Sequence, residues 1–152
     1  DLQSNLKNKN LALGAIDVEY FAAEEALIHS HPEVSNRNCA LIGLSHDRVD
    51  LGILLNSKLI DYRYKPYEST DDVIHFLREK IQEFGEVSLY VYGSGVTFEW
   101  QKIFRKEFGT KYMLLNPFRR MRISGAVPQF SSYLGKEYRF ACCVGSALRT
   151  QS

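Results

Sequence analysis

The chain has 152 residues, a net charge of +1, and a composition that is 45% hydrophobic and 24% charged. These values are typical of one globular domain that buries a single core. The near-neutral charge argues against a dedicated nucleic-acid-binding protein, and no apolar run reaches the ~20 residues that a membrane span needs.

The N-terminal part of the chain predicts a polar arm, a strand and a helix. Residues 1–10 are polar and are expected to form a flexible arm, which leaves residues 11–152 as one domain. Residues 11–16 predict a short strand, and Asp17 is a plausible N-cap for the next helix. Pro32 ends that helix. Its apolar stripe consists of Val18, Phe21, Ala22 and Ala26.

The next stretch predicts three consecutive antiparallel strands. Residues 39–44 are a buried apolar run, and a second run follows at 48–55. A turn at Asn56 and Ser57 leads into a third strand at 58–64. In this strand apolar and charged residues alternate, as expected for a half-exposed strand: Ile60, Tyr62 and Tyr64 against Asp61 and Arg63.

The rest of the chain predicts helices that alternate with strands. ESTDDVIHFLREKIQEFG is an amphipathic helix in which Ser69 and Asp72 have capping-box spacing and Gly85 provides the stop. The following elements are a strand at 87–92, a helix at 97–108 and a strand at 111–115. RFACCVGSALRT predicts a last short helix whose small side chains let it lie close on the sheet.

The order of these elements predicts an α/β fold. A three-strand antiparallel meander is followed by strand–helix–strand units, whose strands are expected to be parallel and joined by right-handed crossovers. This is the ribonuclease H-like arrangement, the half-molecule from which actin-like folds are built.

Four stretches resemble PilM, the actin-like component of type IV pilus assembly, within a superfamily that includes FtsA. They are LALGAIDVEYFAAEEAL, CALIGLSHDRVDLGILLNSKLIDYRY, YVYGSGVTFEWQKIFRKEFGTKYMLLNPFRRMRI and FACCVGSALR. NPFRR and the terminal ALR are the strongest signals. The resemblance implies the second half of an actin-like fold in a cytoplasmic protein. It also implies a partner, an inner-membrane protein resembling PilN whose short tail lies in a groove of the actin-like body.

The chain departs from this family at its nucleotide site. Where the family has an Asp-Ile-Gly turn, this sequence reads Ile42-Gly43-Leu44-Ser45, without a carboxylate to hold a metal-bound phosphate. The half of the fold that supplies the other phosphate loop is not in this sequence. The short link at 64–70 leaves no room for the subdomain that family members insert there. These departures predict a protein that is not an enzyme, with no catalytic residue, metal site or cofactor.

The turn Gly93-Ser94-Gly95 is the one candidate cofactor-binding feature. Glycines between a strand and a helix let backbone approach a ligand, and helix N-termini attract anions. In actin-like ATPases this turn borders the adenosine, so here it is interpreted as a vestigial adenosine turn. The alternative is that a tight strand-to-helix turn simply requires two glycines.

The sequence signals for other catalytic or metal-binding chemistry are weaker. The aspartates are scattered, so a two-metal nuclease is not indicated, and the histidines lack metal-ligand spacing. The cysteines predict buried reduced thiols: Cys39, Cys142 and Cys143. Arg119, Arg120 and Arg122 form a basic cluster that could face a partner or lipid, or be a solvated loop.

The tyrosines are the positive functional signal, because exposed tyrosine beside arginine is favoured in protein interfaces. The candidates are Tyr62, Tyr64, Tyr67, Tyr133 and Tyr138. The alternative is that they cover a half-buried sheet face. The sequence thus predicts a non-catalytic actin-like scaffold of a type IV pilus or type II secretion-like assembly, with self-association as a further expectation. The rival is the C-terminal half of an actin-like ATPase that contacts adenosine through Gly93–Gly95.

Overall fold

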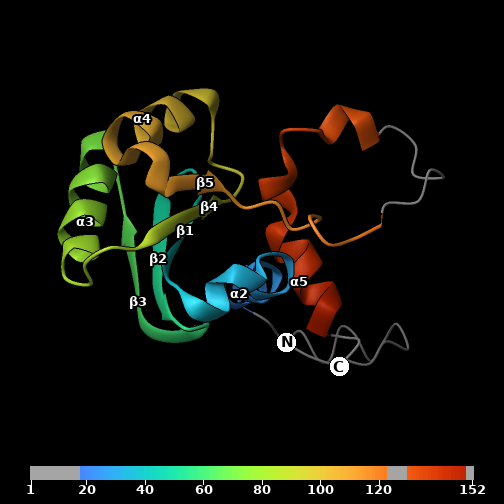
Figure 1. Ribbon diagram of the computed structural model, residues 1–152. Helices are drawn as coiled ribbons and strands as arrows, with labels where there is room; N and C mark the ends of the chain where they lie inside the picture. Colours follow the sequence, from blue (N-terminus) through green and yellow to red (C-terminus); the bar gives the residue numbers. More distant parts are fainter. Residues whose placement is uncertain (1–17, 123–129, 150–152) are drawn as a thin grey trace, which may run out of the picture.

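The computed structural model describes residues 18–122 and 130–149. One mixed sheet of five strands in the order β3-β2-β1-β4-β5 forms its centre (Figure 1). The strands are β1 (Asn38–Leu44), β2 (Arg48–Leu55), β3 (Lys58–Pro66), β4 (Ser88–Tyr92) and β5 (Tyr112–Leu114). β1, β2 and β3 are antiparallel neighbours, whereas β4 is parallel to both β1 and β5. The predicted fold class is therefore confirmed.

Two pairs of helices cover the two faces of the sheet (Figure 1). α3 (Thr70–Gln82) and α4 (Phe98–Phe108) lie on one face, and α2 (Glu19–Ser30) and α5 (Ala141–Arg149) lie on the other. Short 3-10 turns complete the described chain: Pro32–Asn36, Gly109–Lys111, Phe130–Tyr133 and Glu137–Phe140. None of the helices within the described ranges is both long and apolar enough to cross a bilayer.

The predicted elements agree with these bounds to within one or two residues, except at the N-terminus. The predicted arm at 1–10, the strand at 11–16 and the N-cap at Asp17 lie outside the described residues. α2 begins after Val18, which occupies the N-cap position and makes no side-chain capping bond.

The face under α3 and α4 is a mainly aliphatic core. Alternate side chains of β1, β2 and β4 point to this face, because successive strand residues face opposite ways. Phe104 of α4 is fully buried there and lies between the rings of Phe108 and Tyr112. The strands contribute Ala40, Ile42, Leu44, Val49, Leu51, Ile53, Leu89 and Val91.

The opposite face, under α2 and α5, is rich in tyrosine. Tyr20 of α2 packs over Gly52 of β2, where a Cβ atom would lie 1.6 Å from the tyrosine oxygen. Its ring centroid is 4.7 Å from that of Tyr62 on β3. Glycine at position 52 is thus what allows the hydroxyl end of the Tyr20 ring to approach the sheet this closely. Tyr62 therefore covers a half-buried sheet face, which was the alternative to the interface interpretation of the strand tyrosines.

Local signals define the turns and helix starts. Asn56 and Ser57 both have positive φ, 50° and 62°, which matches a two-residue hairpin turn and suits asparagine. Ser69 and Asp72 form the expected reciprocal capping box at the start of α3.

The packing of α5 differs from the prediction that its small residues lie on the sheet. Gly145 instead contacts α2, where a Cβ atom would lie 1.6 Å from the carbonyl oxygen of Ala22. Ala141 reaches the tyrosine-rich core on the sheet. The small residues therefore serve first to bring the two helix backbones together.

We predict that Gly145→Ala destabilises the protein. At an open helical site this substitution is stabilising by about 1 kcal/mol, but the backbone of α2 must move here, which costs about 1–3 kcal/mol. Urea unfolding measures the change. Ser146→Ala, at an exposed neighbouring site, should leave stability nearly unchanged, and an equal gain in both variants would contradict the helix contact.

Candidate functional site

The Gly93-Ser94-Gly95 turn lies at the carboxyl end of β4, beside the end of β1. The Gly95 N–H donates to the carbonyl oxygen of Leu44 at 2.9 Å, and the Gly93 N–H donates to the carbonyl oxygen of Tyr138 at 3.2 Å. Both glycines are buried, and only Ser94 is exposed. The two amides that could otherwise face a ligand are therefore used within the chain.

Both glycines are also required by close backbone packing. A Cβ atom on Gly95 would lie 2.1 Å from the carbonyl oxygen of Ser45, and one on Gly93 would lie 2.3 Å from that of Leu44. Gly93 additionally has a φ of 116°, a conformation that glycine adopts readily. Close packing against Leu44 and Ser45 therefore requires glycine at both positions. The interpretation of the turn as a vestigial adenosine contact stays a prediction.

Two tyrosines cover the same rim. The Tyr67 hydroxyl donates to the carbonyl oxygen of Ser45 at 2.7 Å, and the Tyr138 hydroxyl donates to that of Val96 at 3.1 Å. Tyr138 is only 3% exposed, whereas the sequence suggested a loop position at an interface. Its role could not be inferred from sequence, because no local pattern places that segment beside the end of β4.

The residues at the end of β1 carry no carboxylate, and a buried acid, Asp50, lies on the neighbouring strand β2. Asp50 pairs in register with Gly43 and is 5% exposed. Its carboxylate accepts a hydrogen bond from the Tyr62 hydroxyl at 2.7 Å and one from Arg48 Nε at 3.1 Å. Burial and the bond to Asp50 raise the pKa of Tyr62 to about 12.

This acid is engaged in a charge-assisted network on the sheet and is not a free metal ligand. Within the described residues no three His, Cys, Asp or Glu side chains are grouped to hold a metal ion. Arg48 lies two residues from Asp50 in the same strand, but the Tyr62 hydroxyl comes from β3 and meets Asp50 only through the pairing of the two strands.

The NPFRR segment fastens the chain after β5 to the end of α2. Asn116 Oδ1 accepts from the Phe118 N–H at 3.0 Å, which turns the backbone. Arg119 forms an ion pair with Glu33 and lies 2.9 Å from His31 Nδ1. Arg120 lies at the limit of a hydrogen bond, 3.5 Å, from the carbonyl oxygen of His29. All three arginines of the predicted basic cluster are exposed. Arg119 and Arg120 contact the segment at the end of α2.

The cysteine prediction is correct for Cys39, which is buried, but wrong for Cys143, which is exposed; Cys142 is half-buried. Burial raises the pKa of the Cys39 and Cys142 thiols to about 12. Neither is a thiolate at neutral pH, so neither has the ionisation state of an activated nucleophile.

The remaining candidate tyrosines separate by exposure. Tyr64 on β3 is 63% exposed and Tyr133 is 43% exposed, whereas Tyr62 and Tyr67 are half-buried. The interface interpretation is therefore compatible with Tyr64 and Tyr133 alone among the five.

A three-strand meander continued by parallel strands, with helices on both faces, is the architecture of half of an actin-like ATPase fold. Among solved structures, the chain resembles one described as a PilM-PilN type IV pilus biogenesis complex, with a TM-score of 0.79 and 15% identity. The match covers 97% of this chain and 56% of that chain. The predicted resemblance to PilM is confirmed at the level of the fold.

A weaker likeness, with a TM-score of 0.49 and 18% identity, is to a Bacteroides thetaiotaomicron protein with an actin-like ATPase fold and unknown function. It covers 65% of this chain and 37% of that one. No family model matches the sequence, and no curated protein matches it. The chain spans a little over half the length of the PilM chain.

We predict that Gly95→Ala lowers the free energy of unfolding by about 1–3 kcal/mol, because the new methyl group meets backbone at the end of β1. Ser94→Ala, at the exposed centre of the turn, should have little effect. Both are measured by thermal and urea unfolding without nucleotide. If Gly95→Ala leaves stability unchanged, the close packing does not explain the glycine.

We also predict that Glu33 stabilises the folded protein and that this stabilisation is lost in acid. Burial alone would raise the pKa of its carboxyl, but hydrogen bonds from its own backbone and from Arg119 and His31 outweigh burial and lower the pKa to about 2. The folded value lies below the unfolded value of 4.5. This stabilisation is therefore present above pH 4.5 and is lost as the pH falls toward 2.

Glu33→Gln should remove that part of the pH dependence, as measured by urea midpoints across the acid range. Glu99→Gln, on an exposed glutamate at the start of α4, is the matched control and should keep it. Parallel acid profiles for the wild type and Glu33→Gln would disprove the role of this carboxylate. Burial lowers the pKa of His31 and its contact with Glu33 raises it, so Glu33→Gln should lower the His31 pKa further, whereas Glu99→Gln should leave it unchanged.

Proposed function

We propose that this chain is a non-catalytic actin-like scaffold of a type IV pilus or type II secretion-like assembly. It acts in the cytoplasm and binds the cytoplasmic tail of an inner-membrane protein resembling PilN. The fold match to PilM in a complex with PilN supports this proposal. The comparison concerns about half of that protein, so the partner is inferred by analogy.

The observation that carries the non-catalytic part is the closed glycine turn. The Gly93 and Gly95 amides donate to Tyr138 and Leu44, and the neighbouring carbonyl of Ser45 accepts from Tyr67. Metal-assisted phosphate chemistry needs a carboxylate near this rim, and the buried Asp50 is already paired with Arg48. Nucleotide binding would require several of these bonds to break together.

Apolar surface remains on the outside for protein contacts. Large hydrophobic side chains with more than a third of their area exposed are found on several elements, and in protein interfaces such residues supply the contact area. They are Val18, Ile60, Tyr64, Phe98, Met113, Tyr133 and Leu134. A tail that adds an extended strand or fills a groove is the recognition mode that suits such a surface.

The second candidate is the C-terminal half of an actin-like ATPase. The exposed Ser94, close to the N-terminal end of α4, is the feature that favours it. The amide of Trp100 in that first turn donates to Thr97 Oγ1 at 3.3 Å, so part of the anion-binding capacity of the helix end is already used.

The two functions are separated by titrating the same chain with magnesium-ATP and with a synthetic peptide of a PilN-like cytoplasmic tail. Ligands that bind only the folded state raise its stability, by about 2.7 kcal/mol at a hundredfold excess over Kd. We expect the unfolding midpoint to be unchanged with magnesium-ATP and to rise with the peptide.

A scrambled peptide and Ser94→Arg serve as controls. Ser94→Arg places a large side chain over the turn, so it should abolish any binding of nucleotide there and leave peptide binding unchanged. A midpoint that rises with magnesium-ATP and loses this rise in Ser94→Arg would favour the ATPase half. Failure of the peptide to bind would overturn the proposed partner.

A further inference from the structure

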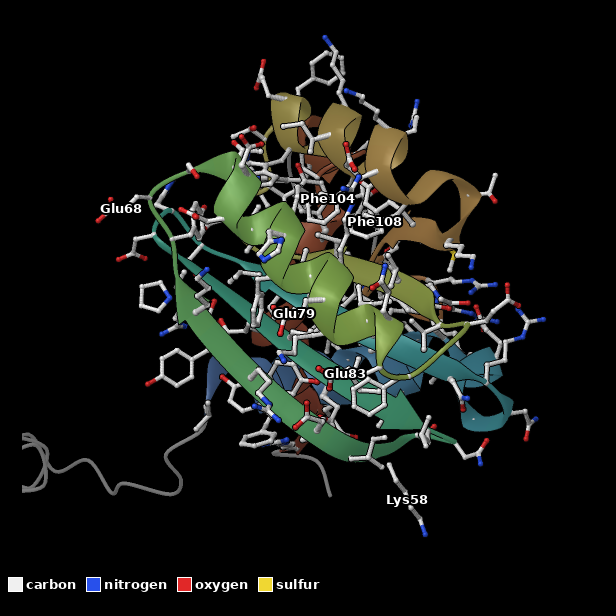
Figure 2. The ribbon with its side chains drawn as sticks, turned by 90° about the vertical axis from the view of Figure 1, so that its left-hand side faces the viewer. Lys58, Glu68, Glu79, Glu83, Phe104 and Phe108 are labelled. Carbon is white, nitrogen blue, oxygen red and sulfur yellow. The ribbon has the colours of Figure 1, made fainter. Side chains whose placement is uncertain are left out.

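β3 is a long, free edge of the sheet. It runs for nine residues, pairs with β2 on one side, and has no strand on its other side within the described chain. Figure 2 shows it along the sheet edge beside α3, with Lys58 at its start projecting outward. Such an edge presents unpaired backbone N–H and C=O groups, which can pair with another strand.

The side chains of this edge are arranged symmetrically about Tyr62. Asp61 and Arg63, of opposite charge, lie one residue to either side. Ile60 and Tyr64 lie two residues to either side, and they are 48% and 63% exposed. Residues at equal distances before and after Tyr62 are therefore complementary: Asp61 matches Arg63 in charge, and Ile60 and Tyr64 are both apolar.

We propose that β3 is a self-association site, at which β3 of a second copy of this chain adds antiparallel with a two-fold axis at Tyr62. In this register Asp61 of each copy lies opposite Arg63 of the other, and Ile60 lies opposite Tyr64. Each contact occurs twice, as in any two-fold interface. The sheet then continues through both molecules.

The register is selected by charge. Opposite charges and apolar pairs directly across an antiparallel pair are stabilising, whereas like charges are destabilising. Moving the axis to Asp61 or to Arg63 would place that residue against itself. Asp61, Tyr62 and Arg63 pair with residues an even number of positions away, so their outward backbone groups coincide and can hydrogen-bond. The register shift at Ile60 interrupts this alternation, so the contact of Ile60 with Tyr64 is one between side chains.

The contacts of the isolated chain are compatible with this pairing. Arg63 Nε lies 3.2 Å from each carboxylate oxygen of Asp61 in the same strand, so association groups four alternating charges without leaving one unpaired. The register of β3 against β2 shifts between Ile53 and Leu54, which leaves Ile60 as the extra residue of a bulge. Its side chain is 48% exposed and is therefore accessible at the edge.

The ends of β3 limit the interface. Pro66 lacks an N–H, and Lys58 and Lys65 resist close approach of another strand's ends. Pairing is confined to the middle of the strand, which makes a small interface. We therefore expect a weak, reversible dimer whose population rises with concentration.

Charge reversal tests the register directly on the full chain by analytical ultracentrifugation. Asp61→Arg and Arg63→Asp each place like charges opposite in both contacts of a homodimer, so each should weaken dimerisation by about tenfold or more. Mixing the two variants makes both contacts complementary again, and a heterodimer should form. The double variant, with both residues exchanged, should dimerise like the wild type.

A purely structural role of the Asp61–Arg63 pair predicts a different result, because mixing cannot repair an ion pair within one strand. Lys106→Glu, on the exposed side of α4, changes charge away from the edge and should leave dimerisation unchanged. Circular dichroism checks that each variant is folded.

Three results would overturn the proposal: a wild type that is monomeric up to millimolar concentration, a dimer that both reversals leave intact, or reversed variants that stay monomeric when mixed. A monomer that binds the PilN-like peptide only while β3 is unaltered would assign the edge to a peptide instead. Slower backbone hydrogen exchange in β3 at higher protein concentration would support the proposed dimer independently.

Discussion

The close approach of the Gly93–Gly95 turn to the end of β1 is the contact on which the rest of the described structure depends. The antiparallel half of the sheet meets the parallel half where β1 pairs with β4, and the hydrogen bond from Gly95 to Leu44, at 2.9 Å, continues that pairing beyond the end of the ladder. Side chains at either glycine would separate the two. In open α/β sheets ligands also bind at the carboxyl ends of the strands where the strand order reverses. The packing of the glycine turn against β1 therefore determines how much of that ligand site is accessible.

The strands and most helices were predictable because their signals are local. Alternation in β3, the turn at Asn56 and the capping box at Ser69 each depend on residues a few positions apart. What the sequence did not reveal depends on distant residues: Tyr138 on the glycine turn, Gly145 against α2, and the exposure of Cys143. No periodicity encodes these contacts, since they form only when separate elements pack together.

The candidate site illustrates the same limit. The sequence identified the turn and the missing acid, both of which are read from neighbouring residues. It left adenosine contact and the needs of a tight strand-to-helix turn as alternatives for Gly93 and Gly95. The distances to Leu44 and Ser45 add a requirement that the sequence did not reveal, because backbone already occupies the space beside each glycine.

The packing of the sheet disfavours an acidic side chain at the end of β1. A Cβ atom on Gly43 would lie 2.6 Å from the hydroxyl oxygen of Tyr92, so even a short side chain there displaces a buried ring. Asp50 lies opposite in β2, and a second carboxylate beside it would add like-charge repulsion. Placing an acid at Gly43 therefore requires coordinated changes on three strands. The exposed edge of β3, by contrast, is accessible without any rearrangement of the sheet.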